Sequence, residues 1–79
     1  MTIIWEAIFM PLVIAPLNVD LRVIKILAEE KIKKHLENLG ITIDSNIMVL
    51  SAQHGSVILK VKEGRLALDR DLATKIIVD

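Results

Sequence analysis

Most of the predicted architecture lies in residues 29–78, EEKIKKHLENLGITIDSNIMVLSAQHGSVILKVKEGRLALDRDLATKIIV. The segment opens with a helical pattern at about residues 29–39 and continues with short apolar runs typical of strands. The helix ends in LENLGI, where Gly40 suits the left-handed position that follows many helices. A Schellman turn is therefore predicted, in which Ile41 folds back onto Leu36. The apolar stripe expected to face the core comprises Ala28, Ile32, Leu36 and Leu39.

Beyond the helix, short strand patterns alternate with tight turns. Val57, Leu59 and Val61 share one parity, which predicts a strand with one buried face. Asp69 is a good N-cap for a short helical turn at about residues 69–74. The predicted strands are 47–50, 57–61, 65–68 and 75–78, and the predicted tight turns are 53–56 and 63–64.

A further strand is predicted before the helix, where apolar residues alternate with polar ones from Leu17 to Val23. The alternation changes phase after Val23, which indicates a β-bulge or a curved strand. Together the patterns predict a mainly β protein with one helix. We expect a small SH3-like β-barrel of five or six short strands, with one α-helix at about 29–39 and a short helical turn at about 69–74.

Composition excludes several classes of function. The 79 residues give room for one domain, and ten basic residues balance ten acidic ones, which argues against nucleic-acid binding. The chain has no cysteine and no Gly-x-Ser-x-Gly or phosphate-loop motif, so neither an enzyme nor a bound cofactor is expected. A small domain without disulfides is typical of the cytoplasm. The apolar start of the chain contains Glu6, Pro11 and Pro16 and predicts neither a signal peptide nor a membrane helix.

The chain divides into an apolar N-terminal extension, residues 1–9, and a domain at residues 10–79. The extension reads MTIIWEAIF, and a core filled by later elements cannot cover all of it. A homodimer is therefore predicted, in which the extension contacts a neighbouring subunit; the alternative is an extra edge strand in a monomer. The self-association residues are Ile4, Trp5, Ile8 and Phe9.

One candidate binding site is a basic strip of Lys60, Lys62 and Arg65 across the last hairpin, suited to an acidic partner surface. No metal site is predicted, because His35 and His54 occupy unrelated positions and imidazole sites normally need three or four converging ligands. The run Asp69-Arg70-Asp71 is interpreted as a helix cap with a solvated turn.

The order of these elements resembles the FeoA family, the ferrous iron transport protein A family, over roughly Pro11 to Val78. The residues that carry this resemblance are Leu39, Gly40 and Ile41 at the helix end, and Gly64, Leu66, Ala67, Leu68, Ala73 and Ile76 near the C-terminus. Two turns depart from the family pattern: Asp44 stands where glycine is common, and SAQHG lacks a frequent proline. The family has no established catalytic residues to carry over.

The resemblance implies a cytosolic SH3-like protein that serves a membrane ferrous iron permease by binding its cytosolic G-protein domain. Neither nucleic-acid binding nor membrane insertion is implied. The alternative is a freestanding SH3-like interaction or dimerisation module, related to the C-terminal domain of iron-dependent transcriptional repressors. The absence of a helix-turn-helix pattern from this chain favours the first interpretation.

Overall fold

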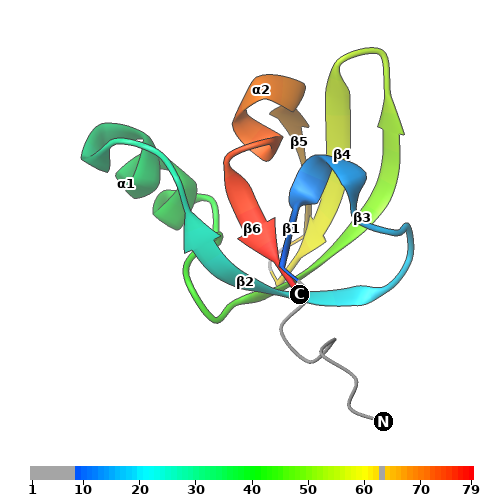
Figure 1. The fold of residues 1–79 in the computed structure, drawn as a ribbon, viewed down its shortest axis with the longest axis horizontal. Helices are drawn as coiled ribbons and strands as arrows, with labels where there is room; N and C mark the ends of the chain where they lie inside the picture. The colour runs from blue at the N-terminus through cyan, green and yellow to red at the C-terminus, as the bar shows by residue number, and fades with distance from the viewer. Residues whose placement is uncertain (1–8, 63) are drawn as a thin grey trace, which may run out of the picture.

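The computed structural model describes residues 9–62 and 64–79, and these form six antiparallel strands with one longer helix (Figure 1). The mainly β, SH3-like architecture predicted from the sequence is confirmed. The elements in chain order are β1 (Met10–Pro11), η1 (Leu12–Ile14), β2 (Asp20–Ile26), α1 (Glu30–Asn38), β3 (Asn46–Gln53), β4 (Ser56–Val61), β5 (Gly64–Asp69), α2 (Arg70–Ala73) and β6 (Ile76–Val78).

The strands follow the order β1-β6-β2-β3-β4-β5, and β2 holds the two halves of the sheet together. The first half of β2 pairs with β3, where Leu21 lies opposite Ile47. Its second half pairs with β6, where Lys25 lies opposite Ile77. The register shifts between Val23 and Lys25, so the bulge predicted near Val23 is confirmed. Such a bulge bends a strand and lets it serve both halves of a curved sheet.

The predicted beginning of this strand was wrong, because β2 begins at Asp20 and not at Leu17. Asn18 adopts a left-handed conformation with φ of 59°, which interrupts the extended chain. Its backbone N–H donates to the carbonyl of Val49 at 2.7 Å. Leu17 and Val19 consequently remain 48% and 45% exposed, although their alternation with polar residues suggested a buried face.

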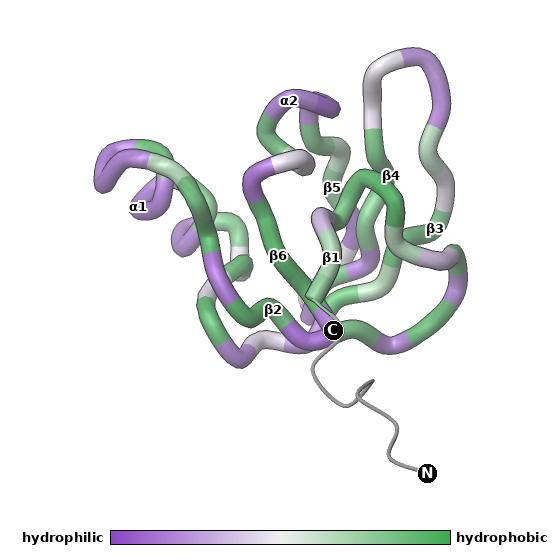
Figure 2. Tube along the Cα trace, viewed as in Figure 1, coloured by the Kyte–Doolittle hydropathy of each residue, from purple (hydrophilic) through white to green (hydrophobic). Residues whose placement is uncertain are grey.

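Among the described residues, the core lies inside the curved sheet and is entirely aliphatic, in keeping with the low aromatic content. Along β4 the buried and exposed residues alternate, with Val57, Leu59 and Val61 turned inward. Figure 2 shows hydrophobic residues along β6, β4 and much of β2. The remaining buried residues are Leu12, Ala15, Leu21, Val23, Ile26, Leu36, Ile41, Ile47, Val49, Leu68, Ala73, Ile76 and Val78.

Helix α1 contacts the core mainly near its C-terminal end and extends away from the barrel (Figure 1). Gly40 has φ of 94°; its N–H donates to Glu37 O at 3.0 Å and the Ile41 N–H donates to Leu36 O at 2.9 Å. These two bonds confirm the predicted Schellman turn, and Leu36 and Ile41 are both fully buried. The predicted stripe was too long, since Leu39 forms the C-cap and does not pack on the core.

The predicted turns are confirmed where the structure describes them. His54 and Gly55 both have positive φ, 46° and 83°, which closes the two-residue loop between β3 and β4. Asp69 caps α2, because its Oδ2 accepts a hydrogen bond from the Asp71 N–H at 3.0 Å. Glu63, in the other predicted turn, lies outside the described residues. None of the described helices is long and apolar enough to cross a membrane.

Candidate functional site

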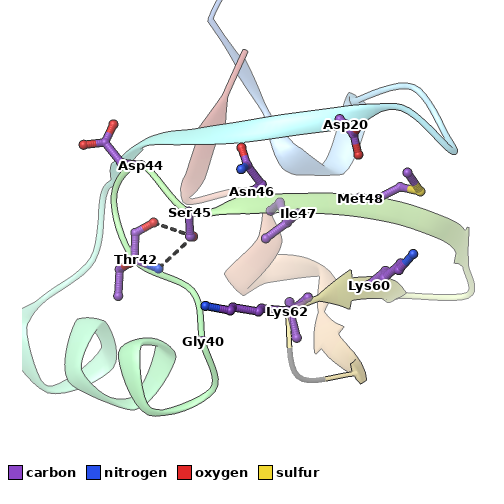
Figure 3. A pocket seen from close by; sticks show the side chains of 11 residues that line it. Asp20, Gly40, Thr42, Asp44, Ser45, Asn46, Ile47, Met48, Lys60 and Lys62 are labelled. Carbon is purple, nitrogen blue, oxygen red and sulfur yellow. Dashed lines mark hydrogen bonds between the residues drawn. The ribbon is translucent and has the colours of Figure 1, made fainter.

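A shallow groove of about 600 Å³ lies over the beginning of β3 and the end of β4 (Figure 3). One wall is the loop between α1 and β3, and the opposite wall is formed by the last residues of β4 and by Lys62. The lining residues are Asp20, Gly40, Thr42, Asp44, Ser45, Asn46, Ile47, Met48, Lys60, Val61 and Lys62. Two of the three predicted partner-binding residues therefore share this groove.

The loop wall is held by local hydrogen bonds. The Ser45 hydroxyl donates to Thr42 O at 2.6 Å and accepts from the Thr42 N–H at 3.1 Å, as the dashed lines in Figure 3 mark. The Asp44 N–H donates to Val23 O at 2.7 Å, and the Val23 N–H donates to Ser45 O at 3.0 Å, which ties the loop to β2. A surface whose backbone is fixed in this way is preorganised for binding.

Of the two lysines of the groove, Lys60 lies in β4 and Lys62 follows the last residue of that strand. In Figure 3 the Lys62 side chain extends across the groove toward the loop at Gly40, whereas Lys60 extends in the opposite direction. Within residues 9–62 and 64–79, neither lysine forms an ion pair. Their charges are therefore available to an acidic ligand from outside this part of the chain.

The acidic residues of the groove stand apart from the lysine wall. Asp20 lies opposite Met48 in the sheet, and Met48 lies opposite Lys60, so one methionine separates the opposite charges. The Asp44 carboxylate points away from the other groove residues in Figure 3. The lysine side of the groove thus offers positive charge beside the half-buried side chain of Met48.

Arg65 does not line the groove. It stands directly opposite Lys60 in the β4–β5 ladder, so these two residues of the predicted basic strip are neighbours. Both side chains are exposed to solvent. Two like charges facing one another across a ladder repel, which favours an acidic group bound between them.

The structure does not bring the two histidines together. His35 lies on the exposed side of α1, and His54 lies in the turn between β3 and β4 on the far side of the molecule (Figure 1). Across the described part of the chain, no three histidine, cysteine or carboxylate side chains are grouped as metal ligands would be. The Asp69 cap accounts for the acidic-basic run at the start of α2.

Of the predicted self-association residues, only Phe9 is described, and its side chain is 56% exposed. Ile4, Trp5 and Ile8 lie outside the described residues. Thr42, Ser45 and Asn46 provide the polar wall of the groove and were not predicted from the sequence as binding residues. The spacing of Thr42 and Ser45, which permits a local side-chain turn, was the available signal.

Comparison with known families identifies one match. A model of the FeoA domain matches residues 10–79, which include every described strand and helix. No curated protein matches the chain at a significant level.

Solved structures show the same fold. The crystal structure of an iron uptake regulatory protein, FeoA, superimposes with a TM-score of 0.81 at 26% identity, covering 91% of this chain and 96% of that one. A FeoA-like protein from Clostridium acetobutylicum gives a TM-score of 0.75 at 20% identity, covering 90% and 85%. A manganese-dependent transcriptional repressor gives 0.80 at 20% identity, covering 89% of this chain and 40% of the repressor.

Proposed function

The chain belongs to the FeoA domain family, and from this membership we propose that it is a cytoplasmic accessory protein that binds the cytosolic G-protein domain of a membrane ferrous iron permease. The family is associated with ferrous iron uptake, and its members are non-enzymatic accessory proteins. The observation that carries the proposal is the match of the family model to residues 10–79. The likeness to a FeoA crystal structure over nearly its whole length supports it.

The groove between the α1–β3 loop and the end of β4 is the surface we assign to this partner. Lys60 and Lys62 supply positive charge beside apolar surface, which suits an acidic loop with an apolar side chain at its centre. Arg65 extends the same strip onto β5. Complementary charge of this kind speeds encounter and fixes orientation, and its effect weakens with added salt.

Calorimetric titration of the full chain with the permease's soluble G-protein domain, with and without guanine nucleotide, tests the proposal. The double variant Lys60→Glu/Lys62→Glu is expected to weaken binding by roughly tenfold or more, because two favourable charge contacts become repulsive. The double variant Lys31→Glu/Lys34→Glu is the matched control. It makes the same change in charge on exposed positions of α1 that do not line the groove.

The outcomes separate the partner from the surface. Absence of binding by the unaltered chain would refute the proposed partner, whereas binding weakened equally by both double variants would refute the groove. Nucleotide hydrolysis measured in the same samples would show whether the contact alters the permease's G-protein cycle or only attaches the two proteins.

A second candidate function follows from the fold shared with the manganese-dependent repressor, of which this chain corresponds to 40%. In that case the chain is a freestanding interaction or dimerisation module of a transcription regulator. The same titration distinguishes the two functions when a metal-dependent repressor replaces the G-protein domain. Binding to the repressor alone would favour this second function.

A further inference from the structure

The two edges of the sheet differ in the protection they have against pairing with another strand. Strand β1 is two residues long and includes Pro11, and short strands and proline both hinder edge pairing. Strand β5, at the opposite edge, is six residues long and contains neither proline nor lysine. Its register with β4 is unbroken from Gly64 to Asp69. Four of its six residues are exposed, including Ala67.

The backbone groups of this edge with which no described strand pairs can be identified from the ladder. Ser56 lies opposite Asp69, so the next pair along the ladder is Gly55 and Arg70. This pair is hydrogen-bonded, because the Arg70 N–H donates to Gly55 O at 2.8 Å. Hydrogen-bonded and non-hydrogen-bonded pairs alternate along an antiparallel ladder. The backbone N–H and C=O groups of the even-numbered residues of β5 therefore bond to β4, and those of the odd-numbered residues point away from β4. The outward groups are therefore the N–H and C=O of Arg65 and Ala67 and the N–H of Asp69, because the Asp69 C=O accepts the first hydrogen bond of α2. No described strand pairs with them.

We propose that β5 is a self-association edge, which pairs antiparallel with β5 of a second copy about a two-fold axis through Ala67. In this register Arg65 lies opposite Asp69 of the partner subunit, and the symmetry repeats that pair on the other side of the axis. The N–H and C=O of Ala67 then pair with the same groups of the partner subunit, and the Asp69 N–H meets the Arg65 C=O of the partner subunit. A register displaced by two residues would separate the opposite charges.

The side chains agree with this register on both faces of the strand. On the outer face, opposite charges flank Ala67, whose small side chain permits close approach at the axis. On the inner face, half-buried Leu66 would lie opposite Leu68 of the partner subunit, which extends the aliphatic core from one subunit to the next. Self-complementary charge and matched apolar residues indicate a second copy of this chain as the occupant.

The experiment is sedimentation velocity of the full chain and its variants over a wide range of concentration. Ala67→Pro removes one outward N–H without removing a bond to β4, and proline is tolerated at such edge positions. Ala67→Thr, at the same position, keeps the N–H and favours a strand. Arg65→Glu replaces each cross-subunit pair with repulsion, whereas Lys31→Glu makes the same change in charge at an exposed position of α1.

The expected result is a dimer that Ala67→Pro and Arg65→Glu each weaken by roughly tenfold or more, while Ala67→Thr and Lys31→Glu leave it within about threefold. Amide exchange locates the contact: protection of the Arg65 and Ala67 N–H groups should rise with protein concentration. The Leu66 and Leu68 N–H groups already bond to β4 and should not respond. If Ala67→Pro fails to fold, Arg65→Glu and the exchange pattern still decide the question.

Three results would overturn the proposal. The first is a monomer at every concentration, and the second is a dimer that both edge variants leave unchanged. The third is a dimer lost in Trp5→Ala but insensitive to the β5 variants, which would place the contact in the N-terminal extension. None of these results depends on permease binding, so the edge and the proposed function can fail separately.

Discussion

Replacing Gly40 with valine tests the connection between the end of α1 and the loop wall of the groove. Gly40 occupies the left-handed position of the Schellman turn with φ of 94°. No heavy atom lies within 4 Å of the place a Cβ would take, so a larger side chain has space around it. Any loss of stability must therefore come from the backbone conformation and not from a clash with neighbouring side chains.

The size of the loss follows from this conformation. An L-residue pays about 1–2 kcal/mol to enter the left-handed region, and a β-branched residue is tolerated there least. We expect Gly40→Val to lower the free energy of unfolding by about 2 kcal/mol, Gly40→Ala by about 1 kcal/mol, and Gly40→Asn by less than alanine. A chain of this size has roughly 4–12 kcal/mol in total. The valine variant should thus melt about 8–16 °C lower.

Urea denaturation followed by circular dichroism gives the free energy of unfolding, provided that the denaturant slope is unchanged. The asparagine variant is the control, because it enlarges the side chain while tolerating the left-handed conformation. An unchanged midpoint for Gly40→Val would refute the argument, since it would mean that the helix can end in another way at no cost. Equal losses for asparagine and valine would also refute it, because the cost would then not arise from backbone conformation.

Three further predictions concern the core, the α2 cap and iron. Leu59→Ala should lower the free energy of unfolding by about 3–5 kcal/mol, because Leu59 is fully buried. Leu27 is 51% exposed, so Leu27→Ala should lower it by about 0.5 kcal/mol or less, and thermal denaturation of both variants tests the difference. Asp69→Ala should cost about 0.5–2 kcal/mol by removing the α2 cap, and an unchanged unfolding midpoint would contradict this. The purified protein should not bind ferrous iron stoichiometrically with micromolar affinity; calorimetry showing one tight site, lost on substitution of His35 or His54, would contradict this.

Features set by local chemistry could be predicted from the sequence. The Schellman turn at Gly40 and the Asp69 cap each depend on a few consecutive residues, and the structure has both. The bulge near Val23 could be predicted because the alternation of apolar and polar residues changes phase there, and such a change has only a few structural causes. Asp44, which departs from the family pattern, has φ of 76°, so it occupies a conformation that glycine adopts more easily.

Features set by distant contacts could not be predicted in the same way. Asn18 bonds to Val49, which is far along the chain, and this contact ends the alternating pattern before β2 begins. Leu39 continues the helical stripe in sequence, yet the turn at Gly40 makes it the C-cap that follows the last residue of the helix. The groove depends on the register of β2, β3 and β4 together, so its loop wall was not foreseen although Lys60 and Lys62 were.

Arg65 belongs to both proposed surfaces, the basic strip and the β5 edge. Substitutions at Arg65 and at its neighbours should therefore affect permease binding and self-association differently. Arg65 stands opposite Lys60 on the basic strip, and its own backbone groups point to the edge of β5 with which no described strand pairs. Reversing its charge should therefore weaken both permease binding and self-association, whereas Lys62→Glu should weaken only the first and Ala67→Pro only the second. If Ala67→Pro also abolished permease binding, dimerisation would be a requirement for the partner contact. If permease binding remained, one subunit would be sufficient to form the site.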